Sequence, residues 1–313
     1  MPDKSIPRAI QAGRDVSFSV ETGSREDIPK LSEAFPISCY RQYFSLKNAD
    51  EIPLHWHRRM QFVRVMEGKL TYTINDQKIH LASGSMLLIN SRQIHSTQTA
   101  SENASTLCIN FDMSVFNQEL VRSLFRPYLA EHPFSYILPD EKLGMQDLIQ
   151  KLCQMENKPA DFLYLISFLY LLMTGVIEGS ENREAQPDPD EIARFRRLAA
   201  FVHEHYMEDI RLKDITDAGL INRTACSELF RKYTGKPPMK YLSQYRLYMA
   251  KEMIRTTDMP ISDISGRCGF NQQSNFISQF RRCYNITPLK YRQSCRSYSD
   301  KEAAVSTTLL GTK

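Results

Sequence analysis

The C-terminal third of this chain contains one short sequence pattern twice. The two copies are offset by 49 residues at the front and by 50 at the back, so one residue has been inserted between them. Such a duplicated unit suits a long ligand that presents equivalent surfaces at a regular spacing, and DNA is the obvious candidate. The matching segments are LKDIT at 212–216 with ISDIS at 261–265, LFRK at 229–232 with QFRR at 279–282, and PMKY at 238–241 with PLKY at 288–291.

The charge distribution supports a polyanionic partner for the same region. The formal net charge is only +4, but residues 191–296 hold 19 Lys and Arg against 10 Asp and Glu, a net charge of +9. The remainder holds 21 against 26, a net charge of −5. A basic segment of this kind is typical of proteins that bind nucleic acid.

The cysteines and the apolar stretches indicate a cytoplasmic protein. The seven cysteines are scattered and form no C-x-x-C pair, which argues against a disulfide framework or a structural zinc site. No apolar secretory segment follows the N-terminus. The longest apolar stretch, 162–177, is shorter than the ~20 residues that a membrane span needs, so we predict a buried packing helix and no membrane association.

The hydropathy pattern predicts an α+β protein. Strands with period-2 alternation, separated by turn residues, run from about 35 to 112 and favour a small antiparallel β-barrel. Helical patterns follow, and a polar, Pro-rich segment at 179–190 is typical of a linker. We predict a polar arm at 1–30, for which disorder stays open, a barrel at 31–115, a helical packing or dimerisation segment at 116–179, a linker at 180–190, a helical DNA-binding domain at 191–293 and a flexible tail at 294–313.

Each copy of the repeat predicts a helix-turn-helix unit, in which the second helix enters the major groove of DNA. The first helices are expected over 212–218 and 261–267. Asn222 and Asn271 are the expected N-caps of the second helices, which end near 232 and 282. A helix from Pro238 to about 254 joins the copies, and its length of roughly 25 Å suits two readers spaced by one DNA turn. The side chains expected to bury the second helices are Cys226, Leu229, Phe230, Phe276 and Phe280.

The same residues carry a family resemblance. The segment 195–293 resembles the DNA-binding domain of AraC/XylS-type transcriptional regulators. The motifs that carry it are FVHEHY at 201–206, LFRKYTG at 229–235, Tyr241-Leu242, Arg246-Leu247, Gly269-Phe270, Ser274, Phe280-Arg281 and TPLKYR at 287–292. The resemblance implies promoter DNA as the partner, a homodimer, and activation of transcription through RNA polymerase.

The resemblance also implies which side chains meet DNA. Glu228 and Ser278 stand where family members often have Arg, so we expect a different operator to be read, with Glu228 accepting from cytosine and the Gln pair favouring adenine. The candidate base contacts are Arg223, Thr224, Ser227, Glu228, Gln272, Gln273, Ile277 and Ser278. The candidate phosphate contacts are Arg231, Lys232, Arg246, Ser274, Arg281 and Arg282. For Arg246, a structural salt bridge between the two subdomains is the alternative.

A histidine cluster in the N-terminal half resembles the cupin motif. His55 and His57 are spaced to share one face of a strand, His95 follows on a later strand, and Gln61 stands where cupins usually place Glu. A neutral amide is a poor ligand for a divalent ion, so no metal or other cofactor is assigned. Effector binding, metal binding and a structural role stay open. Trp56, beside Arg58 and Arg59, suggests a sugar or a carboxylated metabolite as the effector.

The preferred hypothesis is therefore a sequence-specific transcription regulator, more often an activator in the resembled family, whose barrel binds a small-molecule effector. It is not expected to be an enzyme. The alternative is a metal-dependent cupin enzyme with a helical scaffold. A third interpretation, an RNA-binding or architectural protein, predicts no sequence preference and lacks the aromatic stacking platforms of single-strand readers.

Overall fold

A computed structural model describes residues 19–21, 25–27, 37–46, 51–142, 144–155, 158–178, 183–184 and 188–295. The chain divides into two compact units, Met1–Arg196 and Arg197–Lys313. Most of the predicted tail, arm and linker lies outside the described residues, but the helical segment that begins at Pro288 continues to Cys295, two residues into the predicted tail. Within the predicted arm, the strands β1 (Ser19–Glu21) and β2 (Arg25–Asp27) pair in an antiparallel register.

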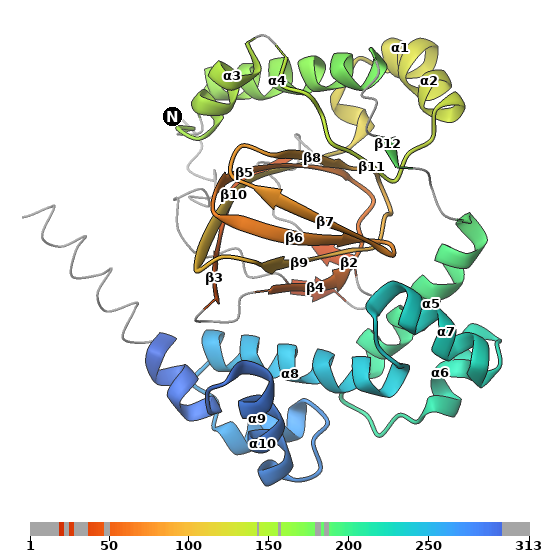
Figure 1. Cartoon of the computed structure of the whole chain (residues 1–313), viewed down its shortest axis with the longest axis vertical. Coiled ribbons are helices and arrows are strands. Elements are labelled where there is room, and N and C mark those ends of the chain that lie inside the picture. Colours follow the sequence, from red (N-terminus) through yellow and green to blue (C-terminus); the bar gives the residue numbers. More distant parts are fainter. Residues whose placement is uncertain are drawn as a thin grey trace, which may run out of the picture. The chain divides into compact units, whose positions relative to one another are not determined.

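The first unit is built on two larger antiparallel sheets, as the alternating strands predict (Figure 1). One sheet has the strand order β12-β11-β8-β5-β10-β3, and the other has the order β4-β9-β6-β7. The strands are β3 (Ile37–Ser45), β4 (Glu51–His55), β5 (Met60–Glu67), β6 (Lys69–Ile74), β7 (Gln77–Ala82), β8 (Met86–Ile89), β9 (His95–Thr99), β10 (Asn103–Phe111), β11 (Tyr136–Ile137) and β12 (Arg183–Glu184).

Strand β5 is buried on both of its faces. Val63 and Val65 belong to the hydrophobic cluster enclosed by the two sheets, whereas Met60 and Phe62 belong to a second cluster on the opposite face of the six-stranded sheet. Because successive side chains of a strand point to opposite faces, one apolar run supplies both clusters. This explains why the sequence MQFVRV alternates less clearly than the strands around it.

The turn between β5 and β6 requires glycine at position 68. Gly68 has a φ of 75°, which L side chains rarely adopt, and a Cβ atom there would lie 2.2 Å from the Asn103 carbonyl oxygen. The neighbouring strand β10 can therefore approach this turn closely only because the residue has no side chain.

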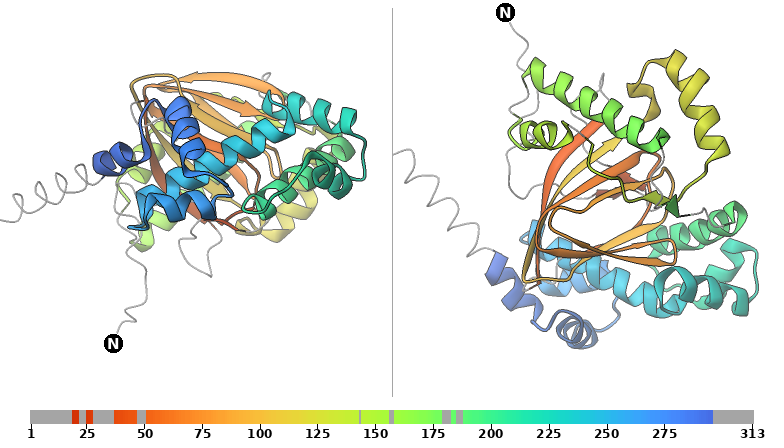
Figure 2. Two further views of the ribbon diagram at one scale, coloured as in Figure 1. Left: turned by 90° about the horizontal axis from the view of Figure 1, so that it is seen from below. Right: turned by 45° about the horizontal axis from the view of Figure 1, so that its top comes forward.

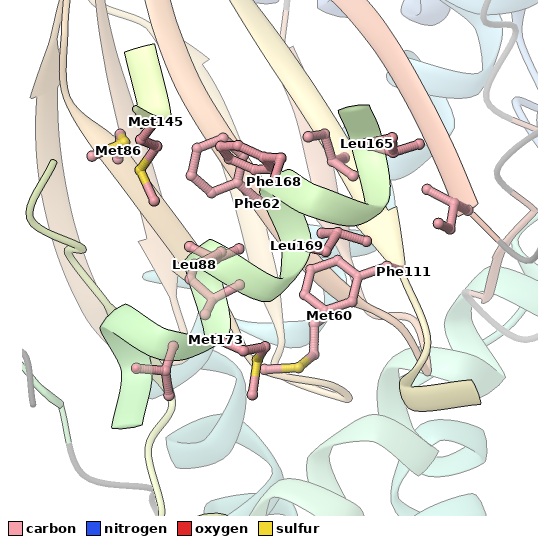
Figure 3. Close-up of a cluster of buried hydrophobic side chains, with 14 of the residues drawn as sticks. Met60, Phe62, Met86, Leu88, Phe111, Met145, Leu165, Phe168, Leu169 and Met173 are labelled. Atoms are coloured by element: carbon pink, nitrogen blue, oxygen red, sulfur yellow. The ribbon is translucent and has the colours of Figure 1, made fainter. Parts of the chain in front are cut away.

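Helices cover the six-stranded sheet on its outer side (Figure 1). The largest is α4, whose Phe168 ring lies 4.9 Å from the Phe62 ring between ring centroids; Figure 3 shows this contact among the buried side chains. A 3-10 turn (Met113–Val115) and a π-helical turn (Val121–Phe125) lie among the helices. The helices are α1 (Gln118–Leu120), α2 (Arg126–Glu131), α3 (Met145–Leu152) and α4 (Pro159–Ile177).

Within the described residues, one helix is long and apolar enough to cross a membrane: the segment Ala160–Ile177 of α4, with a mean hydropathy of 1.9. One side of this helix packs in the cluster that covers the sheet, as predicted, but only 33% of the apolar window is buried, so the predicted burial is met in part. The buried side chains are Leu165, Phe168, Leu169, Leu172, Met173 and Val176.

The second unit is helical, as predicted, and contains two helix-turn-helix units joined by a long helix (Figures 1 and 2). Helix α5 (Pro189–His205) enters this unit. The first helix-turn-helix consists of α6 (Leu212–Gly219) and α7 (Arg223–Thr234), and the second consists of α9 (Ile261–Arg267) and α10 (Gln273–Tyr284). The connecting helix α8 (Pro238–Thr256) has 19 residues and is slightly longer than predicted.

The two turns differ in how the second helix begins. Asn222 is the N-cap of α7, as predicted, and its side chain accepts a hydrogen bond from the Ala225 backbone N–H at 2.9 Å. The prediction of Asn271 as the N-cap of α10 is wrong, because the N-cap is Gln272, whose side chain makes no capping hydrogen bond. Helix α10 therefore begins one residue later than the spacing of the first copy suggested.

Candidate nucleic-acid interface and ligand site

Helix α7 is anchored through one face and exposes the other. Cys226, Leu229, Phe230 and Tyr233 are buried, in agreement with the predicted packing face. Of the four predicted base contacts on this helix, three are exposed and one is partly exposed, so all of them lie at the surface. The exposed residues are Arg223, Thr224 and Glu228, and the partly exposed one is Ser227.

Helix α10 repeats this division between its faces. Phe276, Phe280 and Tyr284 are buried, and Phe276 and Phe280 pack with a ring-centroid distance of 5.6 Å. The predicted contacts on the other face are accessible. Gln272, Gln273, Ser274 and Ser278 are exposed, and Ile277 is partly exposed.

The accessible face of α10 borders an open hollow with a volume of about 650 Å³. Five of its six lining residues are those predicted to contact DNA, namely Ser274, Ile277, Ser278, Arg281 and Arg282. The sixth, Thr287, was missed. Its hydroxyl accepts from the Lys290 backbone N–H at 3.4 Å, at the start of a helical segment that begins at Pro288. The dipeptide Thr-Pro, an N-cap followed by proline at N1, is the sequence signal that could have identified it.

The predicted phosphate contacts lie in the last turns of α7 and α10. Arg231 and Lys232 occupy these positions in the first helix, and Arg281 and Arg282 occupy them in the second. All four are exposed. Cations near a helix C-terminus also interact favourably with the helix dipole, so these residues have a local role besides any contact with phosphate.

Arg246 on α8 is used differently from the other predicted phosphate contacts. Its Nε donates to the Tyr206 carbonyl oxygen at 2.7 Å, and its Nη2 donates to the Glu208 carbonyl oxygen at 2.6 Å. Arg246 therefore has the structural role that the sequence left open, but through backbone carbonyls rather than a salt bridge. It connects α8 to the segment between α5 and α6.

The three histidines predicted to form a cluster meet inside the barrel. His55 and His95 lie opposite each other on β4 and β9, with ring centroids 4.1 Å apart. The His57 ring lies 5.0 Å from the His95 ring. All three are buried, with at most 4% of each residue exposed. The expectation that both rings of the H-x-H motif lie on a strand is only half met, because β4 ends at His55.

Each imidazole of this histidine cluster is held by a backbone carbonyl. Nδ1 of His55 pairs with the Pro53 oxygen at 2.8 Å, Nδ1 of His57 with the Arg59 oxygen at 2.8 Å, and Nδ1 of His95 with the Gln93 oxygen at 2.9 Å. Burial, followed by repulsion from His55 and then from His57, lowers the pKa of His95 well below its ordinary value of 6.5. The His95 ring is therefore neutral at pH 7.

Other polar side chains also face the barrel interior. Gln61 on β5 is in register with Ile89 and with Asn110, and Thr97 on β9 is in register with Tyr72. Gln61 Oε1, Thr97 Oγ1, Asn110 Oδ1 and His95 Nε2 are buried and have no hydrogen-bond partner within the described part of the chain. A buried polar atom without a partner is costly, so this interior is suited to a polar ligand or to ordered water.

Trp56 lies outside this polar set. It is half-buried, whereas His55 and His57 on either side of it are buried. It belongs to neither hydrophobic cluster of the first unit. Arg59, predicted to assist it, donates instead to the Ser38 hydroxyl at 3.1 Å. Ser38 is in register with Asn110, so Arg59 reaches the polar side of the barrel, whereas Trp56 stays half-buried outside the polar set.

Two family models match the chain. One, described as an AraC-like ligand binding domain, matches residues 39–173, and the other, described as a helix-turn-helix domain, matches residues 217–294. A relative, the uncharacterized HTH-type transcriptional regulator YdeC of Bacillus subtilis, is 28% identical over 286 residues, which cover 88% of this chain and 98% of YdeC. The HTH-type transcriptional activator RhaS of Enterobacter sp. (strain 638) is 26% identical over 266 residues, which cover 77% of this chain and 87% of RhaS. The solved structure of ToxT from Vibrio cholerae matches with 16% identity and a TM-score of 0.48, covering 82% of this chain and 98% of ToxT.

The fold, the two sites and these matches define a class of protein, a DNA-binding regulator that combines a ligand-binding barrel with paired helix-turn-helix units. The chain belongs to the AraC/XylS-type transcriptional regulators. It regulates transcription by binding DNA and carries a domain for a small-molecule ligand.

Proposed function

We propose that α7 and α10 read two successive major-groove segments of one promoter duplex, with α8 as the spacer between them. The observation that carries this proposal is that α7 and α10 share one arrangement. Each helix has a buried apolar face, an exposed polar face and a basic last turn. At ~1.5 Å per residue, the 19 residues of α8 span roughly 28 Å. That length is comparable with one turn of DNA, ~34 Å.

Within this arrangement, base-specific contacts come from the exposed polar faces of the two helices. Gln272 and Gln273 suit adenine edges, because an amide can both donate to and accept from that base. Glu228 suits the amino group of cytosine. Arg231, Lys232, Arg281 and Arg282, with Ser274 and Thr287, hold the phosphates and set the register without reading sequence.

The ligand of the barrel is proposed to be a small polar metabolite, either a sugar or a carboxylated compound. The buried polar atoms of Gln61, Thr97, Asn110 and His95 support this class, since each can pair with a hydroxyl or carboxyl group of a ligand. Ligand binding then shifts the population of the DNA-binding state. RhaS proteins are named activators, which supports activation, through contact with RNA polymerase, as the direction of the response.

The protein is further proposed to act as a cytoplasmic, non-catalytic homodimer. Leu163 on α4 is 69% exposed and stands between the half-buried Phe162 and Tyr164. A second copy covering this side of α4 would remove apolar surface from water and double the DNA contacts. The relatives support a non-catalytic role, because they are named as transcriptional regulators.

The test is selection of bound sequences from a random duplex pool by the full chain and by variants. The wild type should enrich two motifs about one helical turn apart. Gln273→Ala should relax one position of one motif, at a cost of about 1–3 kcal/mol for the preferred base, and Arg281→Ala should weaken all sequences alike. Gln77→Ala and Arg122→Ala, exposed residues of the first unit, are the matched controls. A pool without an enriched motif would favour an architectural protein instead.

A further inference from the structure

We propose that His55, His57 and His95 form a binding site for one divalent transition-metal ion inside the barrel. One nitrogen from each ring can be chosen so that the three atoms lie within 4.8 Å of one another. The three side chains come from the end of β4, from the segment after it and from the start of β9. Three imidazoles brought together from one side leave further coordination positions of an ion open toward the barrel interior.

The backbone determines which nitrogen each ring offers. A carbonyl oxygen can only accept, so each Nδ1 that pairs with Pro53, Arg59 or Gln93 must carry the ring proton. In a neutral imidazole the lone pair is then on Nε2. Histidines that bind metals nearly always donate their other N–H to a carbonyl or a carboxylate in this way. The three hydrogen bonds thus set three lone pairs on Nε2 before any ion arrives.

The surroundings of the cluster give a second, independent observation. His95 is 1% exposed, and its Nε2 has no hydrogen-bond partner within the described residues. A buried acceptor without a partner is costly, and an ion bound at His95 Nε2 would remove that cost. Zinc bonds of 2.0–2.1 Å to nitrogen require ligand nitrogens about 3.3 Å apart, and the three atoms lie at most 4.8 Å from one another.

The donor set selects the class of ion. Neutral imidazole suits zinc, copper, nickel, cobalt and iron, whereas magnesium and calcium prefer oxygen ligands. Gln61, also buried, replaces the acidic residue of the cupin motif, so these four residues bring no negative charge to the ion. The full positive charge then favours an anionic oxygen in an open position. This favours the carboxylated metabolite over the sugar, a step that rests on the proposed binding of an effector in the barrel.

The experiment uses the full chain, freed of metal by a chelator and titrated with Co²⁺ in the absence of DNA and of any effector. We expect about one equivalent bound per chain, with visible d–d absorption and no sulfur-to-cobalt charge-transfer band. His95→Gln and His57→Gln should each weaken binding at least tenfold. His80→Gln, an exposed histidine on β7, is the matched control and should bind like the wild type. Zn²⁺ should displace Co²⁺ and raise the Tm of the wild type but not of His95→Gln.

Three results would overturn the metal site: no stoichiometric binding by the wild type, a thiolate band, or equal binding by all the variants. Circular dichroism shows whether the substituted chains fold. If they do not, the stoichiometry and spectrum of the wild type decide alone. The metal titration and the DNA selection are independent readouts, so an enriched DNA motif without cobalt binding would reject the metal site and leave the proposed function standing. The opposite pair of results would support the metal site and reject the sequence-specific reader.

Discussion

Gly269 lies directly against the guanidinium group of Arg246. A Cβ atom at position 269 would lie 2.9 Å from Arg246 Cζ and 2.7 Å from the Tyr206 carbonyl oxygen, which accepts from Arg246. The turn of the second helix-turn-helix unit thus packs on the hydrogen bonds that connect α8 to the segment before the first unit, between α5 and α6. The two halves of the DNA-binding unit are held together at this point, and the contact requires glycine.

Gly269→Ala should therefore destabilise the DNA-binding unit more than a glycine substitution that only strains the backbone. Gly269 has a φ of 75°, and Gly235 at the end of α7 has a φ of 69° with nothing within 4 Å of its added Cβ. We expect Gly235→Ala to cost about 1–2 kcal/mol of backbone strain and Gly269→Ala to cost about 1–3 kcal/mol more. Chemical denaturation followed by helical circular dichroism measures both. Equal losses would show that Arg246 and Tyr206 move away without cost.

The equivalent position of the first copy gives a prediction of opposite sign. Leu220 also adopts a left-handed conformation, with a φ of 52°, and it is 91% exposed. Leu220→Gly removes backbone strain and sacrifices little packing, so the free energy of unfolding should rise by about 0.5–1 kcal/mol. The same denaturation experiment reports it, with Leu289→Gly, an exposed leucine of the same unit, as the control that should not stabilise. A lower free energy of unfolding in Leu220→Gly would mean that the Leu220 side chain makes contacts that stabilise the fold.

The correspondence of Leu220 with Gly269 also explains where prediction from the sequence failed. These residues are offset by 49, whereas the N-caps Asn222 and Gln272 are offset by 50. The inserted residue therefore lies in the turn of the second copy, after Gly269 and before Gln272. Asn is strongly favoured at N-caps, and this preference led to the prediction of Asn271. The longer turn of the second copy instead places the start of α10 one residue later, with Gln272 as its N-cap.

The helices and strands could be predicted because their apolar periodicity records which face is buried. Cys226, Leu229 and Phe230 are an example, since their spacing alone identifies the inner face of α7. The hydrogen bonds of Arg246 could not be predicted, because their acceptors are backbone carbonyl groups of a segment distant in the sequence. Every residue type has such a carbonyl group, so the sequence does not identify the acceptor. The same holds for the histidine cluster, in which three carbonyl groups orient the rings.

The phosphate contacts predict a change in salt dependence. Arg231→Ala or Arg281→Ala removes one exposed cation at matching positions of α7 and α10. Each should lower the slope of log affinity against log salt by about 1 and weaken specific and nonspecific duplexes alike. Fluorescence anisotropy at several salt concentrations measures this, and Arg122→Ala in the first unit should leave the slope unchanged. If the slope is unchanged in Arg281→Ala, then Arg281 does not contact a phosphate.

The proposed dimer predicts that a charge on the outer side of α4 separates the subunits. Leu163→Glu places a carboxylate where 69% of the leucine is exposed, so the fold of a single subunit should tolerate it. The variant should sediment as a monomer and bind DNA more weakly, whereas Leu289→Glu in the DNA-binding unit should remain dimeric. Analytical ultracentrifugation distinguishes these outcomes. A dimeric Leu163→Glu variant would place self-association elsewhere on the chain.

The buried thiols of the DNA-binding unit predict a graded reactivity toward disulfide reagents. Cys226 is buried, and this burial raises the pKa of its thiol to about 11, while Cys283 on α10 is exposed. Because the thiolate is the nucleophile, on the order of one Cys226 in a thousand is ionised at pH 8, and the labelling rate should rise about tenfold per pH unit up to that pKa. At pH 8 the native chain should therefore label at Cys283 first, and Cys283→Ser should remove this fast phase. Denaturation should make Cys226 as reactive as an ordinary thiol, because both the burial and the raised pKa are lost together. Rapid labelling of Cys226 in the native chain would mean that α7 separates from its core within the time of the reaction.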